Sequence, residues 1–147
     1  MRLFLLPALL FVFLASSATG DEKTDADLKA MVGKWKVEKA ELSGKDITEQ
    51  LKELKLEILA GAKYSVVFGK ETDDGALAID PAKTPKTMDA KGNGGPNKGK
   101  TVKAIYKLDG DTLTVCYDHN ADAAKYPAKF ETKEGTTLLL VVYKRKK

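Results

Sequence analysis

The side chains best suited to covalent chemistry are Cys116 and His119, the single cysteine and the single histidine of the chain. A thiol beside an imidazole can act as a nucleophile with its base. In an extended strand, however, residues three positions apart point to opposite faces, so the two meet only if a bulge or turn begins at Tyr117. We therefore interpret Cys116 as a semi-exposed structural thiol near Lys103, and His119 as a surface residue. One thiol and one imidazole are too few for a zinc site without carboxylates, so no metal or cofactor is predicted.

Residues 94–101, Gly-Gly-Pro-Asn-Lys-Gly-Lys-Thr, fit the spacing of a phosphate-binding P-loop. A P-loop follows a strand and opens a helix, whose N-terminus and backbone N–H groups bind the phosphate. Here Thr101 begins an alternating pattern that is typical of a strand. We therefore interpret the string as a turn between two strands and predict no nucleotide ligand.

Several carboxylates lie where the sequence predicts turns. Hydrogen bonding of an Asx side chain to its own turn accounts for each of them, and their spacing does not match a calcium-binding loop. We therefore assign no catalytic or metal-binding role to Asp73, Asp74, Asp80, Asp109 and Asp111.

Three tyrosines, Tyr64, Tyr106 and Tyr117, are the candidates for contact with a ligand. Together with Trp35 they lie on predicted strands, at positions suited to lining an interior cavity. Ordinary packing in a core is the simpler interpretation of each aromatic side chain, and ligand contact is the alternative.

Residues 1–20 have the layout of a signal peptide: Arg2, an apolar run from Phe4 to Ala15 and then small residues. The run is shorter than the roughly 20 residues that a transmembrane helix needs. We expect cleavage after Ala18 or Gly20, and no cysteine stands there to carry a lipid. The expected product, residues 21–147, is one soluble domain in the periplasm or outside the cell, without a transmembrane span.

The charge pattern argues against nucleic acid as a partner. The chain has 25 Lys and Arg against 21 Asp and Glu, a net charge of +4. Nucleic-acid-binding proteins concentrate positive charge on one face, whereas here lysines alternate with acidic residues along most predicted strands. The basic tail at residues 144–147 is interpreted as a solvated chain end.

Short stretches with period-2 alternation or continuous apolar character dominate the sequence after residue 33. Two short helices are expected, one starting at Thr24 or Asp25 and ending at Gly33, the other over 46–53. The predicted strands are one around Trp35 and others at 54–59, 63–68, 76–79, 87–90, 101–108, 112–117, 129–132 and 137–143. This spacing favours an all-β fold with minor helix, an antiparallel barrel or sandwich of about eight or nine strands.

A hairpin around Asp109 and Gly110 is the most specific local prediction. A two-residue Asp-Gly loop favours a primed turn, which would place Tyr106 opposite Leu113. The even positions of the first strand and the odd positions of the second then form the buried face. Ile105 would lie on the outer face.

Five strings of this sequence resemble, in the same order, a domain family expanded in planctomycete bacteria. They are Val-Gly-Lys-Trp-Lys-Val at 32–37, Leu-Lys-Leu at 54–56, and the runs 79–89, 95–101 and 105–113. The resemblance covers Leu28 to Lys144 and implies an uncharacterised, lipocalin-like barrel without established activity. It also implies that Gly33 and Trp35 are structural, with Trp35 filling the closed end of the barrel. The loop from Asp118 to Pro127 departs from the Pro/Gly-rich loop of that family.

These observations favour an exported, non-enzymatic β-barrel protein that binds a small, largely apolar molecule in the cell envelope. The alternative is a module for protein interaction, or a structural envelope module, with a filled core and no ligand, because side chains can fill an eight-stranded barrel. The third hypothesis is an exported enzyme that uses Cys116. Of the three hypotheses we do not favour this one, and we expect the protein to have no enzymatic activity.

Overall fold

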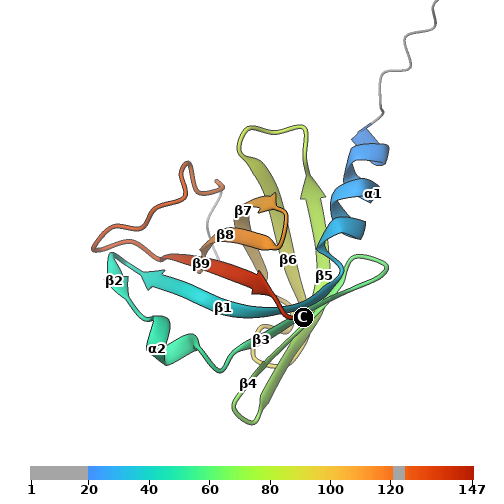
Figure 1. Cartoon of the computed structure of the whole chain (residues 1–147). Coiled ribbons are helices and arrows are strands. Elements are labelled where there is room, and N and C mark those ends of the chain that lie inside the picture. The colour runs from blue at the N-terminus through green and yellow to red at the C-terminus, as the bar shows by residue number, and fades with distance from the viewer. Residues whose placement is uncertain (1–19, 121–124) are drawn as a thin grey trace, which may run out of the picture.

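Residues 20–120 and 125–147, the part of the chain that the computed structural model describes, contain nine strands and two helices (Figure 1). The predicted signal peptide lies outside the described residues, apart from Gly20. The elements are α1 (Gly20–Met31), β1 (Gly33–Leu42), β2 (Lys45–Asp46), α2 (Thr48–Leu51), β3 (Lys55–Leu59), β4 (Lys63–Phe68), β5 (Glu71–Asp80), β6 (Lys86–Gly94), β7 (Thr101–Asp109), β8 (Thr112–Asp118) and β9 (Leu138–Arg145).

Eight of these strands close into an antiparallel barrel. The order is β1-β3-β4-β5-β6-β7-β8-β9, and β9 pairs with β1 to complete the ring, while β2 adds a short pairing at the end of β1. Closure removes the unpaired strand edges that an open sheet would present. The predicted fold class, an all-β, lipocalin-like antiparallel barrel with two short helices, is confirmed.

The two helices differ from their predicted lengths. Helix α1 begins at Gly20, earlier than the predicted start at Thr24 or Asp25, and ends at Met31. Helix α2 is a single turn, Thr48–Leu51, because the chain leaves it at once to enter β3. Asp46 accepts a hydrogen bond from the backbone N–H of Thr48 at 2.9 Å, which fixes the chain just before this turn.

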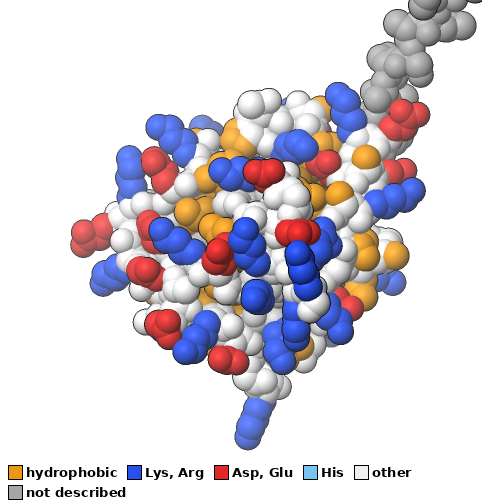
Figure 2. All heavy atoms as spheres, in the orientation of Figure 1, with side chains coloured by type: hydrophobic (Ala, Val, Ile, Leu, Met, Phe, Trp, Pro, Cys, Tyr) orange, Lys and Arg blue, Asp and Glu red, His pale blue; other side chains and the backbone are white. Residues whose placement is uncertain are grey.

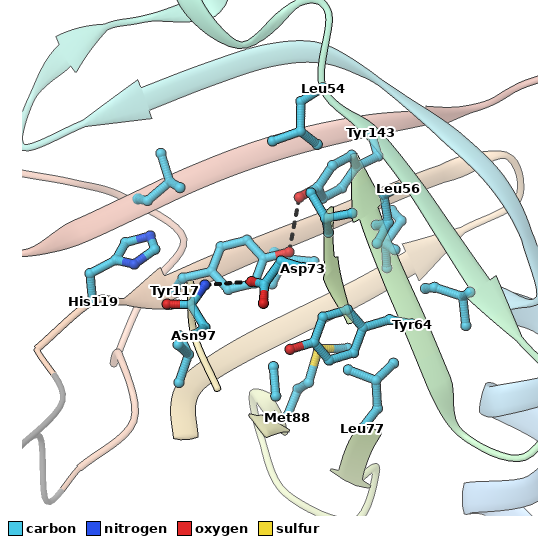
Figure 3. Close-up of a pocket in the computed structure, with 17 residues that line it drawn as sticks. Leu54, Leu56, Tyr64, Asp73, Leu77, Met88, Asn97, Tyr117, His119 and Tyr143 are labelled. Atoms are coloured by element: carbon cyan, nitrogen blue, oxygen red, sulfur yellow. Dashed lines mark hydrogen bonds between the residues drawn. The ribbon is translucent and has the colours of Figure 1, made fainter. Parts of the chain in front are cut away.

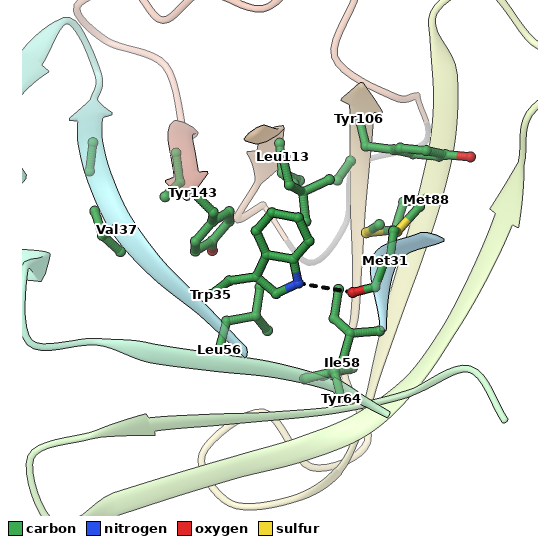
Figure 4. Close-up of a cluster of buried hydrophobic side chains, with 14 residues drawn as sticks. Met31, Trp35, Val37, Leu56, Ile58, Tyr64, Met88, Tyr106, Leu113 and Tyr143 are labelled. Atoms are coloured by element: carbon green, nitrogen blue, oxygen red, sulfur yellow. Dashed lines mark hydrogen bonds between the residues drawn. The ribbon is translucent and has the colours of Figure 1, made fainter. Parts of the chain in front are cut away.

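Alternate residues of the strands, together with Met31 of α1, pack in the barrel interior (Figure 4). This follows from the period of two, which sends successive side chains to opposite faces of a sheet. The largest fully buried side chains of the interior include Trp35 and Tyr106, each 1% exposed. The other buried members of this core are Met31, Val37, Ala40, Leu56, Ile58, Tyr64, Met88, Ala104, Leu113, Val115, Val141 and Tyr143.

Helix α1 is attached to one end of the barrel. Asp27 accepts a hydrogen bond from the Tyr106 hydroxyl at 2.7 Å and an ion-paired hydrogen bond from Lys86 at 2.9 Å. Burial, followed by the neighbouring Asp27, raises the pKa of Tyr106 far above its ordinary value of 10.0. The hydroxyl therefore stays protonated and donates to Asp27.

Trp35 and Arg145 join the end of α1 to the first and last strands. The Trp35 indole N–H donates to the carbonyl of Met31 at 2.9 Å, and the Arg145 guanidinium lies 4.3 Å above the Trp35 ring. Arg145 also donates to the carbonyls of Ala30 and Val32, at 2.6 and 2.8 Å. Gly33 makes this possible, since its φ is +145° and a Cβ there would lie 2.7 Å from Arg145 Nη1.

The β7–β8 hairpin has the predicted faces but a different register. Asp109 pairs with Thr112, and Tyr106 pairs with Val115 and not with Leu113. The two central turn residues are therefore Gly110 and Asp111. Gly110 has a φ of +59°, whereas Asp111 is not among the residues with positive φ, a combination typical of a type II′ turn. The register differs by two residues, so each side chain stays on its predicted face.

A second, smaller buried layer lies on the outer face of β7 and β8. Ile105 and Cys116 point away from the barrel interior yet are 1% and 0% exposed. The segment 125–137 covers them, and the Cys116 thiol contacts the Glu131 carbonyl at 3.9 Å. Ile105 lies on the outer face as predicted, although it is buried there. The predictions of a semi-exposed Cys116 and of a strand over 129–132 are wrong. This segment packs as irregular chain across the strands.

Lys and Arg side chains are interspersed with Asp and Glu on the face of the molecule seen in Figure 2. Lys34, Lys36 and Glu38, for example, stand at alternate positions of β1 and are all exposed. Alternating strand positions therefore give the mixed surface charge that the sequence pattern predicts.

Candidate ligand cavity

A cavity of about 190 Å³ opens inside the barrel (Figure 3). It lies toward the end opposite α1, because its lining residue Asn97 follows the end of β6, whereas Lys86 at the start of β6 bonds to Asp27 of α1. The side chains at its mouth come from strand ends and turns at that end. The deeper ones come from the inward face of the strands. The lining consists of Leu54, Leu56, Ile58, Tyr64, Val66, Asp73, Leu77, Met88, Ala90, Asn97, Val102, Leu113, Val115, Tyr117, His119, Leu139 and Tyr143. Most of these are apolar, and the polar ones are few.

Two tyrosines of the lining form a hydrogen bond with each other. The hydroxyls of Tyr117 on β8 and Tyr143 on β9 are 2.9 Å apart and share a hydrogen bond (Figure 3). Burial raises the pKa of Tyr143 to about 12 and that of Tyr117 well above its usual 10.0. Both hydroxyls therefore remain neutral, and the pair adds polarity to the cavity without charge.

Asp73 and Asn97 form a polar pair at the mouth. Asp73 lies on β5, and its Oδ2 accepts a hydrogen bond from the Asn97 side-chain amide (Figure 3). The sequence predicts a turn at Asp73, but β5 runs through this position from Glu71 to Asp80. The turn lies earlier, at residues 69–70, so the turn interpretation of Asp73 is wrong. The strand places its carboxylate in the lining of the cavity.

The turn at 95–100 carries Asn97 to this position, and two glycines, Gly92 and Gly95, let it approach. A Cβ on Gly92 would lie 2.0 Å from the Asn97 carbonyl oxygen, and one on Gly95 would lie 2.3 Å from the Thr72 carbonyl oxygen. The Gly92 carbonyl also accepts a hydrogen bond from the Gly99 N–H at 2.9 Å. The P-loop-like string is therefore a turn between β6 and β7, as predicted, and Thr101 opens a strand rather than a helix.

Tyr64 packs over Gly75 on the neighbouring strand. A Cβ at Gly75 would lie 2.7 Å from the Tyr64 hydroxyl and 2.0 Å from the Lys91 carbonyl oxygen, so only glycine fits there. Burial, and then the charges of Asp73 and Asp74, raise the pKa of Tyr64 to about 12. The neutral tyrosine thus lies in a region of negative potential.

His119 lies at the cavity mouth, just beyond the end of β8. Its ring centroid is 6.2 Å from that of Tyr117 (Figure 3). Burial of the ring lowers the pKa of His119, and the opposing effect of Asp118 is smaller. The imidazole is therefore neutral at pH 7, because even its ordinary value is 6.5. Asp73 is then the one charged side chain among the described residues of the lining.

The structure brings together some of the residues singled out in the sequence and separates others. Tyr64 and Tyr117 line the cavity, whereas Tyr106 bonds to Asp27 at the opposite end of the barrel. Cys116 lies on the outer face and His119 at the mouth, so they form no catalytic pair. Whether the tyrosines contact a ligand stays a prediction.

The sequence interpretation missed three residues of the site, Asp73, Asn97 and Tyr143. For Asp73 a signal existed, since Asp73, Gly75 and Leu77 alternate with exposed or outward positions. The Asp-Asp-Gly string, which is typical of a turn, obscured it. Tyr143 could have been placed by alternation with Leu139 and Val141 along the last strand.

No protein-family profile matches the chain, and no curated protein or solved structure matches it either. Among the described residues, no helix is both long and apolar enough to cross a membrane, and no group of three or more His, Cys, Asp or Glu side chains could hold a metal ion. The fold and the cavity define the class: an all-β, lipocalin-like antiparallel barrel that is hollow at one end.

Proposed function

We propose that this protein binds a small, largely apolar molecule in its barrel and acts as a carrier rather than as an enzyme. The observation that supports this most is the cavity of about 190 Å³ with its mostly apolar lining. Apolar cavities of about 150 Å³ hold a benzene molecule, whereas sites for drug-sized ligands begin near 300 Å³. The expected ligand therefore has about one ring or a short chain.

The proposal of a non-enzymatic role rests on the reactive side chains. Burial raises the pKa of the Cys116 thiol to about 11, so it is a poor nucleophile near neutral pH. It also lies on the outer face, away from the cavity. A carrier needs only an apolar site and a few groups that orient the ligand.

The setting is part of the same proposal. Residues 1–20 would direct export and be removed, so that the barrel works in the periplasm or outside the cell. Membership in the planctomycete lipocalin-like family, suggested by the five strings, would agree with this setting. The mass of the protein isolated from its native cells tests the removal, because cleavage after Ala18 or Gly20 predicts two specific masses.

Binding of toluene tests the carrier function. We expect toluene to raise the melting temperature of the purified protein by several degrees at concentrations far above its Kd, because a ligand that binds only the folded state stabilises it. An Ala90→Leu substitution should abolish the rise, because Ala90 lines the cavity and a larger side chain fills it. Ala78→Leu is the matched control, because Ala78 is exposed on the preceding strand.

A barrel that binds neither toluene nor other single-ring compounds contradicts the carrier function. One observation would then favour an interaction module: Val67 and Phe68, at the end of β4, are 40% and 43% exposed. Exposed apolar side chains at one end of a molecule are typical of surfaces that meet a partner. Replacing both with serine would then weaken capture of an envelope protein.

A further inference from the structure

The Asp73 carboxylate at the cavity mouth has one oxygen without a partner. Its Oδ2 accepts the hydrogen bond from Asn97, whereas Oδ1 is closed off from solvent and accepts none from any described residue. Removing a charged oxygen from water without a donor is costly, because it forfeits hydration that nothing replaces. The Asp73 carboxylate, whose residue lines the cavity, is therefore short of donors, and a cationic group brought in by a ligand would compensate its charge.

The rest of the lining leaves this charge uncompensated. Among the described residues the lining contains no Lys or Arg, and His119 is neutral at pH 7. The hydroxyls of Tyr117 and Tyr143 already bond to each other. Their rings and that of Tyr64 present aromatic surface, which attracts cations. Charge and surface thus favour the same ligand group, a cation with N–H donors.

We propose that the ligand is a small apolar molecule that carries one protonated amine, and that the amine pairs with the Asp73 carboxylate. This inference rests on the proposed carrier function and specifies its ligand. The apolar part would occupy the deeper region among Leu77, Met88 and Val115. A single ring with an aminomethyl group is within the size set by a cavity of about 190 Å³.

Four single-ring compounds of nearly equal size separate the possibilities: toluene, benzyl alcohol, benzylamine and benzoate. We would titrate each into the unmodified protein at neutral pH by calorimetry. Benzylamine should bind at least about ten-fold more tightly than benzyl alcohol, because a charge-assisted hydrogen bond is stronger than a neutral one. Benzoate should bind most weakly, since its carboxylate would face that of Asp73.

Two matched variants assign the preference to one carboxylate. Asp73→Asn should reduce benzylamine binding to the level of benzyl alcohol while leaving toluene unchanged. Asp74→Asn removes the same charge from the adjacent, exposed residue and should leave the preference intact. Melting curves of both variants establish that they fold. The four-compound comparison on the unmodified protein stands even if Asp73→Asn does not fold.

The outcomes separate this inference from the carrier function. If toluene binds and benzylamine shows no preference, the amine assignment is overturned while the carrier function holds. If none of the four binds, both fail. A benzylamine preference that survives in Asp73→Asn overturns the role of Asp73.

Discussion

His119 is the residue of the cavity mouth whose charge changes closest to neutral pH. Burial holds the pKa of His119 below its ordinary 6.5, so the unfolded chain binds a proton more readily than the folded one at slightly acidic pH. The free energy of unfolding should therefore be highest above pH 6.5 and fall as the pH drops through the lowered pKa. We expect only a modest decrease in the urea midpoint from pH 7.5 to pH 6, because part of the His119 residue stays exposed and solvent screens the effect of its burial.

Replacement by glutamine tests the assignment, because the chain has a single histidine. His119→Gln should flatten the dependence of the midpoint on pH in this interval. An unchanged slope in the variant would assign the effect to other groups. Tyr126→Phe, which alters another exposed ring, is a suitable control.

Single residues of the site could be predicted only where strand alternation governs them. Tyr64 and Tyr117 follow from that rule, because each stands in a strand whose bounds the sequence gives well. Asn97 could not be predicted, since its position depends on a turn that packs against β5 through contacts remote in sequence. Tyr106 also points into the barrel, as alternation predicts. It lies at the end where α1 packs and bonds to Asp27, so it does not line the cavity.

The connection among α1, β1 and β9 depends on Arg145. Its guanidinium stacks on Trp35, bonds to two carbonyls at the end of α1 and pairs with Asp111 at 3.1 Å. Arg145→Ala should lower the free energy of unfolding by about 1–3 kcal/mol, the range for losing a cation–π contact together with charged hydrogen bonds. Urea denaturation followed by tryptophan fluorescence measures this, because Trp35 is the single tryptophan.

Lys147→Ala is the control for this substitution. Lys147 is 3.9 Å from the same Asp111, but its side chain is 86% exposed, so its ion pair should contribute little. Equal effects of the two substitutions would show that the stacking and the helix contacts of Arg145 do not stabilise the fold.

Elements were predictable where their residues face the core with a regular period. Strand β4 has the predicted bounds, Lys63–Phe68, and β3 differs by one residue. The strand predicted over 129–132 does not form. This segment lies as irregular chain against the outer face of the barrel, where the Glu131 carbonyl contacts Cys116 and the Phe130 ring lies 4.8 Å from Lys107 Nζ. The hairpin register differed because Asp-Gly and Gly-Asp turns overlap at residues 109–111 and both keep the same buried face.

The molecule as a whole has two buried layers, which should differ in how readily they open. Cys116 lies in the outer layer, and the segment that covers it, 125–137, joins no strand. Because burial raises the pKa of its thiol from 9.0 to about 11, the thiolate is roughly 100-fold less abundant than in the unfolded chain. We expect alkylation by iodoacetamide at least that much slower in buffer than in urea.

An exposed thiol on the adjacent strand provides the comparison. In a Cys116→Ala/Thr101→Cys protein, the new thiol stands at an exposed position of β7 and should react at the rate of the unfolded chain. If Cys116 reacts as fast as this thiol, the outer layer does not protect it. If toluene slows the reaction of Cys116 strongly, exposure requires unfolding of the barrel and not only of the outer layer.

At this scale the class of fold was predictable, whereas its closure was not. The number of short strands and the absence of a helix-rich half indicate an all-β barrel or sandwich. Pairing of β1 with β9 joins segments about one hundred residues apart, and no local pattern specifies it. The volume of the cavity likewise depends on the combined volumes of the inward side chains of all eight barrel strands, which no single strand's pattern specifies.

The pairing of β1 with β9 also determines when the barrel can close during synthesis. While the ribosome still holds β9, β1 has no partner on one side and β8 ends the sheet, so two strand edges are unsatisfied. Long-range pairing of this kind slows folding, because the loop between the partners must close first. The barrel therefore stays open, with two unpaired edges accessible to chaperones, until residues 138–145 are free to pair.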